Sequence, residues 1–208
     1  MALEGTHIRF ALDLKNKFQV KDLYKYIAGT VYPDSRYVTK IDRNITHDKN
    51  LLINNFYQNN DFKKGWFVHL VCDQVQSTIL KQTFPDIVKN DKMSSREWVL
   101  KTSLKIIQDI YDVKQFPIKD YLKYLKYAET LNGENIKKLK IYNKIFIDMY
   151  QKDKLEIQDS IDMWDKFGID KKLITQLTKI TNQMNSDKKI IDKIPLLYPK
   201  MLDFYNNL

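Results

Sequence analysis

The sequence predicts an all-α protein, a multi-helix bundle, and three observations lead to this prediction. Five glycines and five prolines in 208 residues supply little of the turn chemistry that strand-rich folds need. Hydrophobic residues make up 43% of the chain, which is enough to bury the core of one sizeable domain. Apolar residues also recur at helical spacing along most of the chain.

Two helices and a long loop are predicted at the start of the chain. Apolar periodicity predicts a first helix over about residues 5–17 and a second over 20–28. We expect Gly29 to stop the second helix, because glycine often ends helices and Pro33 follows closely. Residues 30–50 keep no helical period, so they predict an ordered loop, and loops of this length are usually functional or disordered.

A central helix is predicted over residues 62–83, because apolar side chains cover it nearly all round. A soft boundary near residues 86–94 follows it. We therefore expect a helical core over residues 1–92 and a helical C-terminal region over residues 93–208 packed on it, or one continuous domain.

The C-terminal region is predicted to consist of helices only. Ser94 and Glu97 form a capping-box pattern, which predicts a helix that begins there and runs to about Val113. Gly133 and Gly168 are expected to separate later helices, and Pro195 and Pro199 to kink or break the last one. The helices are predicted at about residues 118–130, 134–151, 155–167, 171–185 and 188–205.

The net charge of +9 raises the question of a nucleic-acid partner. The basic residues are spread evenly along the sequence and form no Lys/Arg block, so we expect no nucleic acid as a stable partner. The N-terminal sequence lacks a signal-peptide pattern, and no apolar run is long enough for a transmembrane segment, so we expect a cytoplasmic protein. The sequence leaves a homo-oligomer open.

The three histidines are the strongest pointers to chemistry. His69 and Asp73 lie four residues apart on the predicted central helix, so an imidazole and a carboxylate share one face. Burying that carboxylate is costly unless it is paired or bound to a metal. A buried hydrogen-bonded pair is the structural alternative. Gly65 lies one turn earlier, where a missing side chain lets another backbone or a ligand approach.

The predicted loop carries two more candidate ligands. Asp34 follows the expected helix stop, and His47 lies near the far end of the same loop, although an aspartate there also suits an ordinary turn. His7 lies on the first helix. Three imidazoles and two carboxylates suit zinc, and also manganese, iron or nickel. The single cysteine, Cys72, excludes a multi-cysteine metal site.

Arginine gives a weaker indication. The chain has only four arginines, and Arg36 and Arg43 both lie in the predicted loop beside candidate ligands. In a chain this rich in lysine, we expect arginine where a planar guanidinium group is needed, either to bind phosphate or to pair with a carboxylate.

These residues resemble the zinc-dependent phospholipase C family, whose helical fold is shared with the S1/P1 nucleases. The shared pattern is an early His, a helix with Gly and a Pro-Asp turn, a His, and a helix with Gly-x-x-x-His-x-x-x-Asp. The pattern corresponds to His7, Asp34, His47 and the segment from Gly65 through His69 to Asp73, and the resemblance covers about residues 5–80.

The resemblance implies a fold and a chemistry. It implies a bundle of the phospholipase C/P1 nuclease type with a helical C-terminal extension. It implies that Asp34, His47, His69 and Asp73 surround one metal, and that His7 reaches a second metal bridged by Asp73. The fullest members hold three metals with ligands further along. This chain has no histidine after His69, so one or two zinc ions are carried over.

The expected function is therefore metal-dependent hydrolysis of a small phosphate ester. Asp34 would orient the attacking water or act as general base, and Arg36 and Arg43 would stabilise charge on phosphate. One alternative is an HD-type phosphohydrolase, because His47 and Asp48 form a literal His-Asp pair. Another is a catalytically reduced metal-binding or interaction protein of the same fold.

Overall fold

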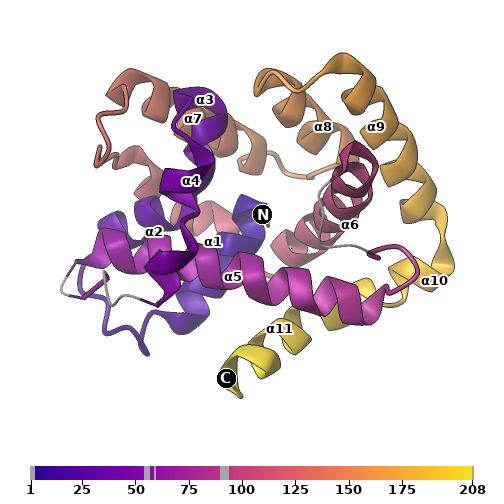
Figure 1. Ribbon diagram of the computed structural model, residues 1–208, viewed down its shortest axis with the longest axis horizontal. Coiled ribbons are helices and arrows are strands. Elements are labelled where there is room, and N and C mark those ends of the chain that lie inside the picture. Colours follow the sequence, from indigo (N-terminus) through magenta and orange to yellow (C-terminus); the bar gives the residue numbers. More distant parts are fainter. Residues whose placement is uncertain (1–2, 54–56, 59, 90–93, 208) are drawn as a thin grey trace.

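The computed structural model describes residues 3–53, 57–58, 60–89 and 94–207. Within these ranges helices are joined by turns and loops and no strand occurs, so the all-α prediction is confirmed. Figure 1 shows one long helix, α5 (Asp61–Thr83), running across the molecule with the other helices around it. The prediction of a central helix at this position is also confirmed.

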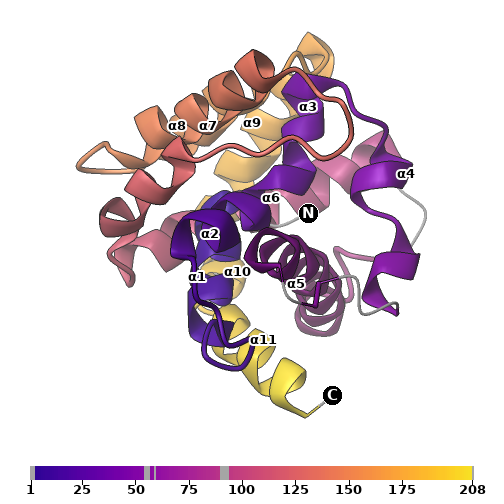
Figure 2. The same cartoon turned by 90° about the vertical axis from the view of Figure 1, so that its left-hand side faces the viewer.

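Helices α1 (Glu4–Leu14) and α2 (Leu23–Val31) both pack against α5, and α2 makes the most extensive helix contact in the described structure. The side chain of Asp22 caps α2 by accepting hydrogen bonds from two backbone N–H groups in its first turn. Figure 2 shows α1 and α2 together on one side of α5.

The expectation that Gly29 stops the second helix is wrong, because α2 continues through it to Val31. Gly29 instead allows α2 and α5 to touch backbone to backbone. A Cβ atom at Gly29 would lie 2.0 Å from the carbonyl oxygen of Phe62, and one at Gly65 would lie 1.9 Å from that of Tyr26. The expectation that Gly65 lets another backbone approach is confirmed.

The expectation of a loop without helix over residues 30–50 is also wrong. Beyond the end of α2, four short helical segments occupy this part of the chain and its continuation. They are η1 (Tyr32–Ser35), α3 (Arg36–Thr39), α4 (Arg43–Thr46) and η2 (Lys49–Leu52). Asp42 and Asp48 cap α4 and η2 with their side chains. Segments of four residues are held by local hydrogen bonds, so they need no sustained apolar period.

The C-terminal helices lie close to their predicted positions. Ser94 and Glu97 form the predicted capping box. Gly133 and Gly168 adopt left-handed φ angles of 76° and 77° between helices. The elements are α6 (Ser95–Lys114), η3 (Ile118–Lys126), α7 (Ile136–Tyr150), α8 (Ile157–Lys166), α9 (Lys171–Ser186), α10 (Lys188–Ile191), η4 (Ile194–Leu196) and α11 (Leu197–Asn206).

Two details of this region differ from expectation. The segment predicted as a helix over residues 118–130 is a 3₁₀-helix that ends at Lys126. The last predicted helix is broken near Pro195, as expected, but Pro199 lies inside the first turn of α11. Proline is tolerated there because the first N–H groups of a helix have no partner within it.

A buried polar network joins the start of α1 to α6 and α7. Asp109 of α6 accepts hydrogen bonds from the backbone N–H of Thr6 at 2.7 Å and from the hydroxyl of Tyr150 at 2.8 Å. The Tyr150 hydroxyl in turn accepts from the N–H of Gly5 at 2.8 Å. The start of α1 is thereby fixed against α6 and α7. The expected boundary between residues 92 and 93 lies outside the described residues.

None of the helices in the described part of the chain combines the length and the apolar character that a bilayer crossing requires.

Substitution Gly65→Ala should destabilise the protein strongly. The added methyl group would meet the Tyr26 carbonyl, and helix backbones cannot rearrange as cheaply as flexible side chains. We expect a loss of about 3 kcal/mol in the free energy of unfolding, at the upper end of overpacking effects. Urea unfolding measures it. Gly168→Ala is the control. Open space surrounds Gly168, so only the left-handed φ should lower the free energy of unfolding, by about 1 kcal/mol. Equal losses in the two variants would contradict close packing of α2 on α5.

Candidate metal centre

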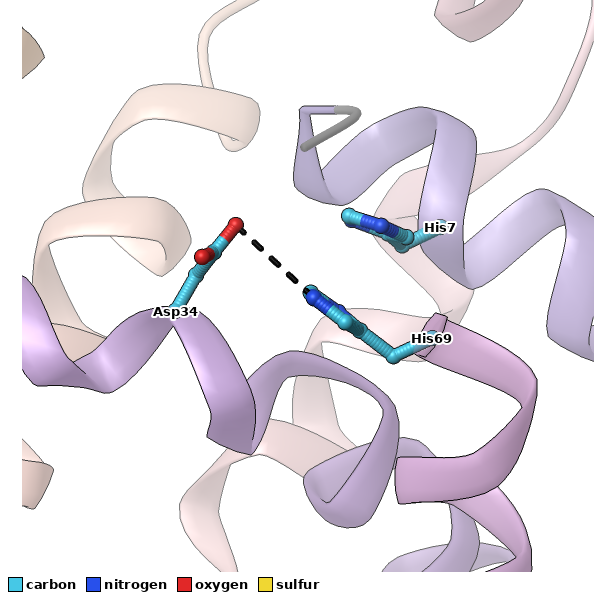
Figure 3. A group of neighbouring side chains, drawn as sticks. All are labelled: His7, Asp34 and His69. Carbon is cyan, nitrogen blue, oxygen red and sulfur yellow. Dashed lines mark ion pairs between the residues drawn. The ribbon is translucent and has the colours of Figure 1, made fainter. Parts of the chain in front are cut away.

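The structure brings all five predicted ligands together from four segments of the chain. His7 comes from α1, Asp34 from η1, and His47 follows the end of α4. His69 and Asp73 lie one turn apart on α5. In Figure 3 the His7 and His69 rings lie face to face beside the carboxylate of Asp34. Their ring centroids are 3.9 Å apart.

The ligand atoms converge at short distances. The Nε2 atom of His47 lies 3.4 Å from Oδ1 of Asp34 and 3.7 Å from Oδ2 of Asp73. The Nε2 atom of His69 lies 4.0 Å from Oδ2 of Asp34 and 3.8 Å from Oδ2 of Asp73. The two Nε2 atoms are 3.4 Å apart. Ligands about 2.1 Å from a tetrahedral ion are separated by about 3.4 Å, so this spacing suits a single ion between them.

The two carboxylate oxygens of Asp73 face different histidines of the cluster. Its Oδ1 atom lies 3.4 Å from Nε2 of His7, and its Oδ2 atom faces His47 and His69. Two overlapping groups of side chains could therefore hold a metal ion: His7 with Asp34 and His69, and His47 with His69 and Asp73.

The orientation of His69 is fixed from outside the cluster. Its Nδ1 atom lies 2.8 Å from the carbonyl oxygen of Thr30. A carbonyl only accepts, so Nδ1 carries the proton and the lone pair of Nε2 points into the cluster. His47 has a similar support, because its Nδ1 atom lies 2.9 Å from the hydroxyl of Thr46. The Nε1–H of Trp66 donates to the Thr46 carbonyl at 2.8 Å, which holds that residue in place. Such supports are typical of metal-binding histidines.

The cluster is largely buried, and its protonation suits a cation. His7 and His69 are fully buried, and burial lowers the pKa of each imidazole, that of His69 well below its usual range. Burial alone would raise the pKa of Asp34, but the imidazoles of His47 and His69 next to its carboxylate hold it below its usual range. Neutral imidazoles beside charged carboxylates leave negative charge in a largely buried site, which a bound cation would neutralise.

Buried atoms without hydrogen-bond partners show that these residues fit a metal. Both ring nitrogens of His7 and Oδ1 of Asp34 are buried and have no hydrogen-bond partner among the described residues. Buried polar groups in native proteins are nearly always paired, so unpaired atoms of neighbouring side chains in one cluster indicate a ligand-binding site. The unpaired atoms are imidazole nitrogen and carboxylate oxygen, which are the donor types that zinc and similar ions take.

Arg36 reaches the edge of the cluster, and Arg43 does not. The Nε atom of Arg36 lies 3.8 Å from Oδ1 of Asp34. One of its terminal nitrogens donates to the Tyr37 hydroxyl at 2.7 Å. The Tyr37 ring stacks on Phe167, so the C-terminal helices help to position this arginine. Arg43 is exposed at the start of α4, and among the described residues its side chain forms no ion pair or hydrogen bond with the cluster.

Comparison with known proteins gives no match: no protein-family model, no curated protein and no solved structure is similar to this chain. The resemblance to the zinc-dependent phospholipase C family therefore stays a prediction. The geometry of the cluster supports a metal site.

Elemental analysis should find at least one equivalent of a divalent transition metal in protein purified without an affinity tag. His69→Ala should lose that metal, because it removes a nitrogen common to both groups of ligands. Cys72→Ala is the matched control: Cys72 is buried on the same helix but belongs to neither group, so the metal content should stay unchanged. Wild-type protein that stays metal-free after incubation with zinc and manganese would contradict the site.

Thr46→Val should weaken metal binding without removing a ligand. Valine keeps the shape of threonine but takes away the hydroxyl that contacts Nδ1 of His47. We expect the dissociation constant for zinc to rise about 10- to 100-fold, as for other residues that orient metal-binding histidines. Competition with a chromogenic chelator measures it. Thr181→Val makes the same change at a buried threonine of α9, and an equal effect there would show that the change acts through stability alone.

Proposed function

We propose that this protein is a metal-dependent hydrolase of phosphate esters, with one or two zinc ions as its cofactor. The convergence of five histidine and aspartate side chains carries the proposal. Three of them are buried and two are partly buried, and atoms of His7 and Asp34 have no hydrogen-bond partner among the described residues. The resemblance of residues 5–80 to the zinc-dependent phospholipase C family supports the choice of zinc and of a phosphate ester. Oδ1 of Asp73 faces His7 and its Oδ2 faces His69, an arrangement that is compatible with a second ion next to His7.

Asp34 and Arg36 would have different roles in the reaction. A divalent metal supplies a Lewis acid and makes a coordinated water more acidic. The Asp34 carboxylate is charged, so it can accept a proton from that water or orient it. The Arg36 guanidinium, held by Tyr37 next to Asp34, can donate hydrogen bonds to phosphate oxygens as negative charge develops. Arg43 is assigned no part in this step, because it lies away from the cluster.

The HD-type alternative is less compatible with the structure. It requires His47 and Asp48 to bind one metal side by side. Asp48 instead caps η2, where Oδ1 accepts a hydrogen bond from the N–H of Asn50 at 2.9 Å.

A second candidate function is metal binding without turnover. The chain has no histidine after His69, so the ligands for a third metal are missing on the pattern of the resemblance. The same centre would then serve to stabilise the fold or to bind a partner.

The zinc-loaded protein should hydrolyse bis(p-nitrophenyl) phosphate or p-nitrophenyl phosphate, and a chelator should abolish the reaction. Arg36→Ala should lower kcat by about 100-fold, as for removal of a donor to a developing negative charge. Release of p-nitrophenol measures the rate.

Arg96→Ala is the matched control, because Arg96 lies exposed at the start of α6 and should leave the rate unchanged. Metal-replete protein with no turnover of either ester would favour the binding function. Turnover that is insensitive to Arg36→Ala would contradict the role of the arginine.

A further inference from the structure

The fold gathers lysines that are scattered in the sequence. A surface hollow of about 770 Å³ lies between the α1–α2 connection, the start of α5 and the end of α11. Four lysines line it: Lys17, Lys21, Lys25 and Lys64. None of the five residues of the metal centre lines this hollow, so it is a separate site.

The acidic residues in the hollow are already engaged. Asp61 accepts hydrogen bonds from the N–H groups of Lys21 and Asp22 at 2.9 and 2.7 Å. Its other oxygen accepts from Nζ of Lys64 at 2.7 Å. Asp22 accepts from the N–H groups of Tyr24 and Lys25, as the cap of α2. The carboxylates therefore hold the backbone in place, and because four lysines face only two aspartates, the hollow keeps a net positive charge.

Two ammonium groups are available for a ligand. Lys21 directly precedes the cap of α2 and Lys25 lies in the first turn of that helix, and neither side chain forms an ion pair or hydrogen bond among the described residues. Like charges around one hollow repel each other, and a multiply charged anion would relieve that repulsion. Phosphate is the anion that lysine commonly binds in proteins.

The wall of the hollow is aromatic. Partly exposed rings of Phe18, Tyr57, Phe67 and Tyr205 line it. The first three form one cluster, with the Tyr57 and Phe67 ring centroids 4.4 Å apart. The Tyr205 ring already receives the ammonium of Lys17 at 4.2 Å from its centroid. Aromatic rings beside basic side chains favour a planar ring joined to phosphate, since a planar ring can stack on them.

We propose that this hollow is a second, metal-independent site that binds a nucleoside diphosphate or a closely similar phosphorylated aromatic compound. The aromatic cluster receives the planar ring, and Lys21 and Lys25 bind the phosphates. The volume suits such a ligand, because small-molecule sites commonly measure about 300–1,000 Å³.

Titration calorimetry with adenosine diphosphate tests the site in metal-free protein kept in excess chelator. Adenosine alone and pyrophosphate alone should each bind at least about tenfold more weakly, because each lacks one half of the recognised chemistry. The double variant Lys21→Ala/Lys25→Ala should weaken binding of adenosine diphosphate by about tenfold or more.

The double variant Lys137→Ala/Lys138→Ala is the matched control, because it removes the same charge from exposed positions on α7 and should bind like wild type. Three outcomes would overturn the proposal: no binding, pyrophosphate binding as tightly as the nucleotide, or an affinity unchanged by Lys21→Ala/Lys25→Ala. Binding that needs the metal would place the nucleotide at the metal centre and would also overturn it.

Discussion

The backbone contact between α2 and α5 is the constraint on which the rest of the structure depends. Gly29 and Gly65 leave no room for a side chain between the helices, so the two backbones meet directly. That contact brings the carbonyl of Thr30 to Nδ1 of His69 and fixes the orientation of the ring. Asp34 follows the same helix within one turn, so the position of one ligand and the orientation of another have a common cause. A metal centre needs this kind of rigid support, because ligand atoms must be held to within a fraction of an ångström.

The metal centre is an exception to the rule that buried polar groups are paired. The described residues satisfy Asp109 with backbone and hydroxyl donors, whereas both ring nitrogens of His7 remain without hydrogen bonds. Both groups are fully buried. Unpaired imidazole nitrogens beside a charged carboxylate destabilise the fold, and proteins usually keep such an arrangement where it binds a ligand. The contrast between these two buried sites is the physical basis for assigning a metal to one of them and a structural role to the other.

Much of the fold and the pairing of His69 with Asp73 could be predicted from sequence because those signals are local, whereas the grouping of all five ligands rested on the family resemblance. The apolar character of α5, the capping box at Ser94 and the spacing of His69 and Asp73 act over a few residues. The sequence prediction failed where tertiary structure decides. Glycine ends many helices, but Gly29 serves helix packing, and nothing local distinguishes the two uses. The support of His69 by a backbone carbonyl leaves no trace in residue identity, and the lysines of the basic hollow are neighbours only after folding. Arg36 and Arg43 looked alike in sequence, yet only the first reaches Asp34.

The most direct test of a metal at this centre is anomalous diffraction from crystals of the zinc-loaded protein, measured on both sides of the zinc absorption edge. We expect a peak between the imidazoles of His47 and His69 and the carboxylates of Asp34 and Asp73. A second peak beside His7 would show that Asp73 bridges two ions. Zinc found only at other positions, with the five side chains hydrogen-bonded to one another and to water, would contradict a metal site at this centre.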